Sequence, residues 1–501
     1  RHCLQEFISP DQIDQVLKGE GSITYADIVS VLAKLQESGG GKGGSRGGGG
    51  SGSILDAIFP SARTSAEQLA AWLATPSSDS VIENKGGRGE ILRLATKLGL
   101  SPDSAVQFDK LRLDTARHVL VGEFVLDVKG DRPPSTALVA SPKNVEQEKL
   151  LRQTADAFRR GHADQYEAMA DQIEAEFQLS SAGVTAERLG SIDTFRFEEK
   201  SLLSHAGLLV ADGRFAEAAD VVTTHARSFW ADRDARRQQQ WEACGRMGAL
   251  GQEVARVRAA LPPASAGPSI WFRGYTNLQS GPQSGWFSVD TLYRQLQSHL
   301  ASMADVPDSE AAQHAVLNAY DELAGEMTAR FMGAMKAASW QVPGDVLRQP
   351  QVFDEIVSKP TSDGSPVAMI LADSLRYEMG VELAAWFNDA KSIEVKAAAA
   401  AIPTITPIGM AALLPGASRS FDVVDGGEKV GAKIDGKVMT GLKDRMTFLQ
   451  GKVPGSKDIE LDQLLAITGA QLKSRLHGVK LLVVRDAAVA TALIAAAREL
   501  S

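Results

Sequence analysis

The chain has 501 residues, of which 44% are hydrophobic and 23% are charged. This composition is ordinary for a globular protein, and the length corresponds to about three domains. No apolar run approaches the roughly 20 residues that a membrane-spanning helix needs. The formal net charge of −9 argues against non-specific DNA binding over the whole surface, although it is compatible with a local basic patch.

The two cysteines, Cys3 and Cys244, are far apart in the sequence. This excludes a disulfide framework and a Cys-rich zinc site, and it favours a reducing, cytoplasmic compartment. The chain begins with Arg1, inside a helical pattern, and not with Met. We therefore expect that it lacks its natural start, which leaves open a targeting segment ahead of it.

Residues 1–38 form a predicted N-terminal helical segment. Residues 39–53 read GGGKGGSRGGGGSGS. Such a Gly/Ser-rich stretch behaves as a flexible linker and cannot hold a hydrophobic core.

A helical domain is predicted for residues 54–180. Thr64 and Glu67 have the spacing of a capping box at the start of a helix that carries Leu69 and Trp72. Further helical patterns cover residues 91–98, 108–126 and 144–178, and the last of these is expected to break near Gly161.

Residues 181–348 form a predicted helical middle domain. A helical hairpin is expected around the turn at Asp212-Gly213-Arg214. Aromatic residues then concentrate between Trp271 and Phe287, where base stacking is conceivable and packing between helical layers is favoured. Helices are predicted at 288–303 and 309–338, with Asp290 as a cap of the first and an ion-pair partner of Arg294.

The last predicted domain, residues 349–501, has the pattern of a parallel α/β sheet. An apolar run from Pro366 to Ala372 ends on Asp373, and a helical pattern follows it. A β-compatible segment, 393–402, and a short helix, 408–414, complete a strand–helix–strand–helix order. Beyond these, the sequence predicts short strands at 421–438, helices at 441–449 and 461–476, a buried strand at 480–484 and a helix from Ala487.

Candidate site residues follow two of these predicted strands. Ligands of parallel α/β sheets bind beyond the carboxyl ends of the strands, where we place Asp373 and the pair Thr404 and Thr406. An acid and a hydroxyl at adjacent strand ends suggest a metal ligand and a nucleophile. Because Thr406 precedes Pro407, it also suits a helix N-cap, where backbone N–H groups favour an alkoxide or a phosphate oxygen. From spacing alone, a simple cap is the favoured interpretation.

Asp373 has a second interpretation as the cap of a helix that starts at Ser374. Asp486, after the last predicted strand, is either a further metal ligand or a cap. Lys443 and Arg445 are near the site by chain proximity only.

Arg376 is a candidate phosphate clamp, and an ion pair with Glu378 or Glu382 is its default role. Other catalytic signatures do not compete with this site. The sequence contains no Walker A loop, no Gly-x-Gly-x-x-Gly after a strand, no Gly-x-Ser-x-Gly outside the Gly/Ser-rich linker and no His-Glu-x-x-His.

Two segments, ILADSLRYEM at 370–379 and IPTITPIGMAALLPG at 402–416, together resemble the PglZ family of the BREX and phage-growth-limitation defence systems. The resemblance extends through the helical half and looks closest to the type 2 system. It implies a domain of the alkaline phosphatase superfamily, whose members use two divalent metals, often zinc, and a metal-bound Thr or Ser nucleophile. By this resemblance Asp373 matches the first metal ligand and Thr406 the nucleophile and metal ligand, with Thr404 as the alternative nucleophile.

One departure from the family pattern concerns the later Asp-His and His ligands. The only histidine after Asp373 is His477, which precedes a predicted strand and does not end one. We therefore expect an incomplete alkaline-phosphatase-like domain that is inactive alone.

The resemblance implies a metal-dependent phosphoesterase in phage defence, with phosphoprotein, nucleotide and nucleic acid as open substrates. Its implied partners are other subunits of the defence system, namely a DNA methyltransferase and ATPase components, with DNA as a further candidate and no membrane. Two rival functions stay open: a non-catalytic scaffold subunit, and a metal-dependent nuclease.

Overall fold

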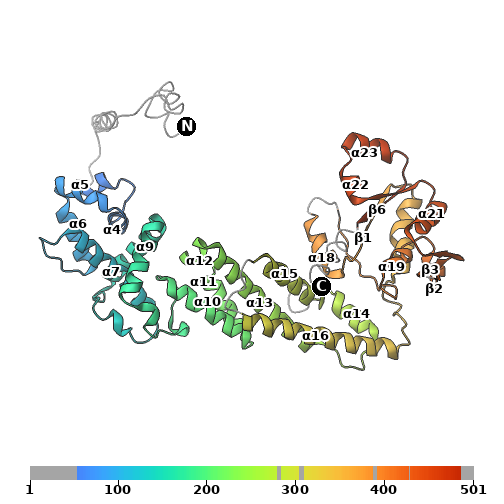
Figure 1. The fold of residues 1–501 in the computed structure, drawn as a ribbon, viewed down its shortest axis with the longest axis horizontal. Coiled ribbons are helices and arrows are strands. Elements are labelled where there is room, and N and C mark those ends of the chain that lie inside the picture. The colour runs from blue at the N-terminus through green and yellow to red at the C-terminus, as the bar shows by residue number, and fades with distance from the viewer. Residues whose placement is uncertain (1–52, 279–283, 304–309, 388–391, 428, 487–501) are drawn as a thin grey trace, which may run out of the picture.

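The computed structural model describes residues 53–278, 284–303, 310–387, 392–427 and 429–486. The predicted helices within 1–38, nearly all of the Gly/Ser-rich linker and the helix predicted from Ala487 lie outside these residues. Figure 1 shows an elongated helical half that leads into a smaller domain, which holds the strands.

The first half of the described chain is helical. Long helices alternate with short ones, and the longest is α16, which runs along the middle of the molecule (Figure 1). The helices are α3 (Ile54–Ile58), α4 (Ser65–Ala74), α5 (Asp79–Asn84), α6 (Arg88–Leu98), α7 (Phe108–Asp127), α8 (Val145–Gly161), α9 (Ala163–Glu176), α10 (Arg196–Ala211), α11 (Phe215–His225), α12 (Phe229–Arg233), α13 (Ala235–Ala260), α14 (Pro268–Thr276), α15 (Phe287–Ser302) and α16 (Glu310–Ala337).

Local sequence signals explain several of these boundaries. The capping box at α4 is present, since the Thr64 hydroxyl accepts from the Glu67 N–H at 3.2 Å and the Glu67 carboxylate accepts from the Thr64 N–H at 2.9 Å. The predicted break near Gly161 separates α8 from α9. The predicted hairpin is formed by α10 and α11, which flank Gly213 with its left-handed φ of 74°.

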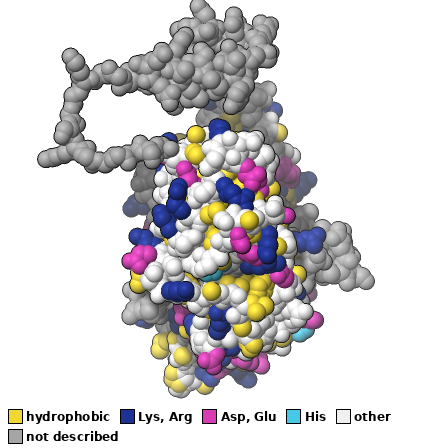
Figure 2. Space-filling model, turned by 90° about the vertical axis from the view of Figure 1, so that its left-hand side faces the viewer, with side chains coloured by type: hydrophobic (Ala, Val, Ile, Leu, Met, Phe, Trp, Pro, Cys, Tyr) yellow, Lys and Arg dark blue, Asp and Glu magenta, His cyan; other side chains and the backbone are white. Residues whose placement is uncertain are grey.

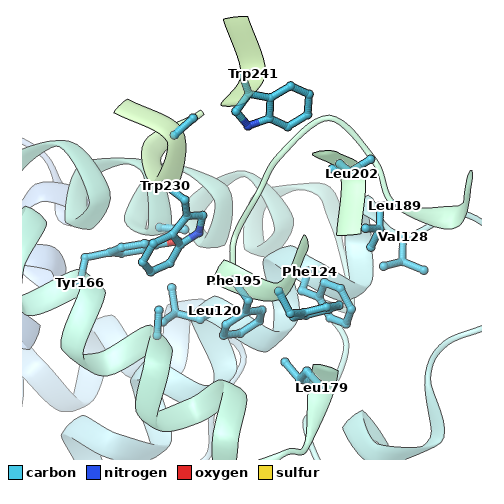
Figure 3. Close-up of a cluster of buried hydrophobic side chains, with 14 of the residues drawn as sticks. Leu120, Phe124, Val128, Tyr166, Leu179, Leu189, Phe195, Leu202, Trp230 and Trp241 are labelled. Atoms are coloured by element: carbon cyan, nitrogen blue, oxygen red, sulfur yellow. The ribbon is translucent and has the colours of Figure 1, made fainter. Parts of the chain in front are cut away.

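One cluster of buried hydrophobic residues runs through the helical half from Leu55 to Ala334. Aromatic rings lie within it, where Phe124 is edge-on to Phe195 with ring centroids 5.7 Å apart (Figure 3). Tyr166 lies edge-on to Phe158 at 5.5 Å. Because this cluster extends across residue 180, the domain boundary between 180 and 181 stays a prediction.

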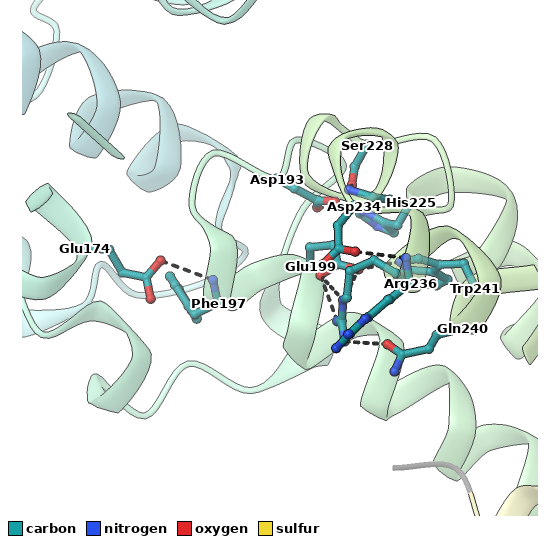
Figure 4. A network of polar contacts seen from close by, with 12 residues as sticks. Glu174, Asp193, Phe197, Glu199, His225, Ser228, Asp234, Arg236, Gln240 and Trp241 are labelled. Carbon is teal, nitrogen blue, oxygen red and sulfur yellow. Dashed lines mark hydrogen bonds and ion pairs between the residues drawn. The ribbon is translucent and has the colours of Figure 1, made fainter. Parts of the chain in front are cut away.

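A buried polar network joins the loop before α10 to α11, α12 and α13 (Figure 4). The Asp193 carboxylate lies 2.8 Å from His225 Nδ1, and the Asp193 carbonyl accepts from the Trp230 indole at 3.1 Å. The Glu199 carboxylate accepts from the Trp241 indole at 2.5 Å. Asp193 and Glu199 thus each have a buried partner for one carboxylate oxygen, as a low-dielectric interior favours, while Asp193 Oδ2 has none within the described ranges.

The aromatic segment packs inside the protein. Trp271 and Trp286 are both buried and meet edge to face at 5.5 Å, which confirms packing as the better interpretation. The predicted roles of Asp290 were wrong. Its carboxylate accepts from the Tyr275 and Tyr320 hydroxyls at 2.6 and 2.7 Å and does not cap α15.

The predicted pair of Asp290 with Arg294 was also wrong, since Arg294 contacts Glu382 of the C-terminal domain. On the surface at the N-terminal end of the molecule, basic side chains are interspersed with acidic ones (Figure 2). Within the described ranges, no helix combines the length and apolarity that would let it cross a membrane.

The C-terminal domain contains short helices and two small sheets. Its elements are a π-helical turn (Phe353–Val357), α17 (Ser358–Ser362), β1 (Val367–Ala372), α18 (Tyr377–Trp386), α19 (Thr406–Ala412), α20 (Ala417–Ser420), β2 (Asp422–Asp425), β3 (Val430–Ile434), β4 (Lys437–Met439), α21 (Leu442–Lys452), β5 (Ser456–Glu460), α22 (Leu461–Leu465), α23 (Gly469–Leu476) and β6 (Leu481–Asp486).

The two sheets differ in strand direction. Strands β1, β6 and β5 form a parallel sheet in that order, in which Val367 pairs with Leu481 and Ala372 with Asp486. Strands β2, β3 and β4 form an antiparallel sheet. The predicted fold class is confirmed: a helical half is followed by a small parallel α/β domain. A second buried cluster, which includes Ile408, Phe448 and Val483, joins α19 and α21 to the parallel sheet.

One predicted element of this domain was wrong, and another is interrupted. The segment 393–402 is not a strand, because only Ala399 pairs there, through an isolated parallel bridge with Arg348. The predicted helix 461–476 is divided into α22 and α23. Strand β5 was not predicted, since Ser456-Lys457-Asp458-Ile459-Glu460 lacks the apolar run of a buried strand.

Candidate functional site at the carboxyl edge of the parallel sheet

Asp373 and Asp486 lie side by side at the carboxyl edge of the parallel sheet. Strands β1 and β6 are neighbours, and the Asp373 N–H donates to the Asp486 carbonyl oxygen at 2.9 Å. The carboxyl edge is where parallel α/β sheets place their ligands. The structure therefore brings together two acids that are more than a hundred residues apart in sequence.

Thr406 reaches the same edge from another element. Its hydroxyl donates to the Asp373 carboxylate, with Oγ1 at 3.1 Å from Oδ2 and 3.4 Å from Oδ1. The following residues of α19 anchor it, because Ile408 and Ala411 are fully buried in the second core cluster. Thr406 is exposed and Asp373 is half-buried, so both side chains are open to a ligand from solvent.

Neither side chain takes the capping role that spacing alone favoured. Helix α18 begins at Tyr377 and not at Ser374, so Asp373 lies too far upstream to cap it. Thr406 is the first residue of α19, whose N-cap is Ile405, and no side chain caps that helix. The acid and the hydroxyl bond to each other instead of to helix ends.

Thr404 does not join this contact. Its side chain is exposed, and it makes no hydrogen bond with any residue that the structure describes. Of the two threonines that the sequence placed at this edge, only Thr406 contacts Asp373.

Arg376 turns away from the acid and the hydroxyl. Its guanidinium lies 2.8 Å from the carboxylate of Glu378, which is buried. Burial raises the pKa of Glu378, and the charge on Arg376 opposes that rise. The next residue, Tyr377, donates from its hydroxyl to the Thr276 carbonyl at 2.9 Å, so this turn faces the helical half.

Two further arginines lie on the face of the sheet that Asp373 shares. Arg445 of α21 and Arg485 of β6 line a small enclosed cavity together with Leu371. Sequence reasoning placed Arg445 nearby but missed Arg485. The signal for Arg485 was its position two residues after the buried Val483, because alternate residues of a strand face the same side.

The donors at this edge fit one side of a metal site. A divalent cation accepts carboxylate and hydroxyl oxygens such as those of Asp373 and Thr406. Across the part of the chain that the structure describes, no group of three or more His, Cys, Asp or Glu side chains is placed to hold an ion. His477 is exposed and precedes β6, so it lies at the opposite edge from Asp486. The described residues thus supply part of one ligand set and do not form a two-metal centre.

Comparison with known proteins gives this domain a family. The family model described as the BREX system PglZ alkaline phosphatase-like domain matches residues 352–490. An alkaline phosphatase-like protein BrxZ from Escherichia coli O9:H4 (strain HS) is 35% identical over 129 residues, which are 24% of this chain. An alkaline phosphatase-like protein PglZ from Bacillus cereus (strain H3081.97) is 22% identical over 249 residues, which are 48% of this chain.

These alignments cover only 14% and 27% of the relatives' own lengths. No solved structure matches the chain significantly. The matched region of the family model contains β1, α19, α21 and β6, and with them all the candidate residues at the carboxyl edge. Residues 352–490 of this chain are therefore similar to the BREX system PglZ alkaline phosphatase-like domain.

Proposed function

We propose that this protein is a BREX-type phage-defence protein whose C-terminal domain hydrolyses phosphate esters with Thr406 as the nucleophile. The observation that supports this most directly is the 3.1 Å contact between the Thr406 hydroxyl and the Asp373 carboxylate at the carboxyl edge of the sheet. The contact orients Thr406 Oγ1 and leaves it accessible. A nucleophile needs both properties.

In the proposed reaction, Thr406 Oγ1 forms a bond to phosphorus while the bond from phosphorus to the ester oxygen breaks. Water then cleaves the phosphothreonine and regenerates the hydroxyl. As a further part of the proposal, Asp373 and Thr406 would hold a divalent metal, zinc by family resemblance. A metal at such a site stabilises charge on the reacting oxygens.

The matched variants Thr406→Ala and Thr404→Ala test this assignment. In the full-length protein supplied with zinc, Thr406→Ala is expected to lower kcat for bis-p-nitrophenyl phosphate by about a thousandfold or more, as loss of a nucleophile does. Thr404→Ala should change kcat by less than about twofold, because Thr404 does not contact Asp373. Asp373→Asn should lower the amount of zinc bound per protein molecule, which elemental mass spectrometry would measure.

Equal turnover by the Thr406→Ala and wild-type proteins would contradict the nucleophile. Arg376 stays a prediction as a phosphate clamp. Its ion pair with Glu378 must open before it binds phosphate, and Arg376→Ala tests it in the same assay.

A scaffold function is the second candidate, and exposed apolar side chains on the helical half favour it. Leu138 and Val145, near the connection from α7 to α8, are 94% and 76% exposed. We propose a DNA methyltransferase and ATPase components of the defence system as partners, and a cytoplasmic location. Phage defence that persists in the Asp373→Ala variant would favour the scaffold over the enzyme.

DNA is one of the three proposed substrate classes, beside nucleotides and phosphoproteins. Direct DNA contact predicts binding that weakens steeply with salt, because each neutralised phosphate releases counterions. A salt-independent interaction would leave nucleotides and phosphoproteins as the substrates to test.

A further inference from the structure

Arg445 lies in the first turn of α21, at the edge of the sheet that carries Asp373. Helix α21 ends at Lys452, and only three residues separate it from the start of β5. A helix with so short a connection runs back along the strand that follows it. Its first turn therefore lies at the carboxyl ends of the parallel strands.

A small cavity of about 30 Å³ confirms this placement. Arg445 lines it together with Met410 of α19, Leu371 of β1 and Arg485 of β6. Leu371 is two residues before Asp373, so the two side chains share one face of the strand. Arg445 thus lies on the face of the sheet toward which Asp373 and α19 direct their polar groups.

The Arg445 side chain is largely buried and has no matched acceptor among the described residues, while its guanidinium nitrogens keep some contact with solvent. Arg445 is 8% exposed, and among the described residues its side chain makes no hydrogen bond or ion pair. Burial lowers its pKa, whereas the charges of Asp444 and Asp373 favour the protonated form. A guanidinium keeps its charge in proteins, and a buried charge without hydrogen bonds is destabilising unless a partner arrives.

The other cations near this edge have a carboxylate partner or face solvent, although Arg485 Nε is itself buried without a hydrogen-bond partner in the described part of the chain. Arg485 lies 3.3 Å from Asp458 and 3.5 Å from Glu460 on the neighbouring strand β5. Arg376 is paired with Glu378, and Lys443 is exposed. Arg445 therefore differs from Arg485 and Arg376 in having no carboxylate partner among the described residues, so its N–H groups can bind an added anion.

We propose that Arg445 binds a non-bridging oxygen of the phosphate ester that reacts at Thr406. This assignment rests on the proposed phosphoesterase function. The planar guanidinium presents parallel N–H donors that match phosphate oxygens, and a partly desolvated setting strengthens such bonds. Thr406 would then contact one side of the phosphoryl group and Arg445 another.

Binding of inorganic phosphate tests this role without requiring turnover. Isothermal titration of the full-length protein would compare the wild type with Arg445→Met, Arg445→Lys and, as the matched control, Lys443→Met. We expect Arg445→Met to weaken phosphate binding by at least about tenfold, as loss of a charge-assisted hydrogen bond does. Arg445→Lys should fall in between, and Lys443→Met should stay within about twofold because Lys443 is exposed.

Thermal melting separates phosphate binding from a structural role. Because Arg445→Met removes a buried, unmatched charge, its Tm without phosphate should equal or exceed that of the wild type. Phosphate should raise the Tm of the wild type and leave that of Arg445→Met unchanged. A lower Tm together with wild-type phosphate affinity would assign Arg445 a structural role and overturn the proposal.

The outcomes also separate this inference from the proposed function. If Thr406→Ala abolishes turnover while Arg445→Met binds phosphate normally, Arg445 is excluded and the nucleophile stands. If Arg445→Met loses phosphate binding while Thr406→Ala retains turnover, Arg445 is an anion-binding residue and the nucleophile is excluded. Absence of phosphate binding by the wild type would overturn the assignment of Arg445.

Discussion

Asp373 and Thr406 are 33 residues apart in sequence, and the chain must return to the carboxyl edge of β1 to bring them together. Two anchors achieve this: β1 pairs with β6 up to Ala372, and α19 buries Ile408 directly after Thr406. Both polar side chains are thus held by buried neighbours while they stay open to solvent. At the scale of single residues, the site is a pair of polar side chains, one after the end of β1 and one at the start of α19.

The residues of this pair were predictable, because an acid after an apolar run and a threonine before Pro407 are visible in the sequence. Their mutual contact was not, since it depends on how β1 pairs with a strand more than a hundred residues later. Arg485 was missed for the same reason, because its neighbours are known only once β6 has been placed between β1 and β5.

A second prediction at this scale concerns Glu198, which is fully buried in the helical half. Burial, reinforced by the charges of Asp193, Asp127 and Glu123, raises its pKa well above the ordinary value of 4.5. The folded state then keeps a proton that the unfolded state loses as the pH rises above 4.5, so this group lowers stability with increasing pH.

The Glu198→Gln variant should therefore melt a few degrees higher than the wild type at pH 8 and show little gain at pH 4.5. Glutamine retains the acceptor that bonds the Phe195 N–H at 2.8 Å. Calorimetry at several pH values would measure the effect, with the exposed Glu355→Gln as the control. The same gain at pH 4.5 and at pH 8 would show that the carboxyl is not the titrating group.

At the scale of elements, close helix contacts in the helical half depend on single glycines. A β-carbon at Gly251 of α13 would lie 2.2 Å from the Phe215 ring of α11, so these helices approach closely because that atom is absent. Gly325 of α16 has no neighbour within 4 Å of the corresponding position. The two glycines offer the same mutation in opposite packing environments.

Alanine at the two positions should therefore act with opposite signs. Gly251→Ala is expected to lower the free energy of unfolding by about 1–3 kcal/mol, because the ring must move out of a packed core. Gly325→Ala should raise it by up to about 1 kcal/mol through helix propensity. Urea unfolding would measure both changes, and a neutral Gly251→Ala would mean that α11 shifts freely.

Elements with local signals were predicted well, and elements that depend on distant partners were not. The capping box of α4 and the break between α8 and α9 are encoded within a few residues. The segment 393–402 alternates in a strand-like way, yet it makes only one bridge, at Ala399. Strand β5 consists largely of polar and charged residues, and it is held as a strand by its pairing with β6. No local sequence pattern reveals that pairing.

At the scale of the molecule, helix α18 links the candidate site to the helical half. Glu382 of α18 contacts Arg294 and accepts from Gln295 of α15 at 2.9 Å. Tyr377, at the start of α18, packs edge-on against Phe287 with ring centroids 5.4 Å apart. These contacts join residues about a hundred positions apart into one interface.

Loss of the Glu382 carboxylate should loosen this interface. Arg294 and Glu382 are each about three-quarters buried. Glu382→Ala should therefore lower the free energy of local opening of α18 by about 1 kcal/mol, which corresponds to about fivefold faster hydrogen exchange of the α18 amides. Glu394→Ala removes a more exposed ion pair, with Lys396, and should leave α18 unchanged. Faster exchange in β6 as well would indicate general unfolding of the domain.

The segment between Asp373 and α18 is three residues long, and Ser374 within it has a left-handed φ of 63°. Because this segment is short and already contains an uncommon backbone conformation, it can absorb little change in the orientation of α18. A rotation of α18 with the helical half therefore displaces the carboxylate that bonds Thr406. A partner that bound the helical half and turned it would therefore also move Asp373 relative to Thr406.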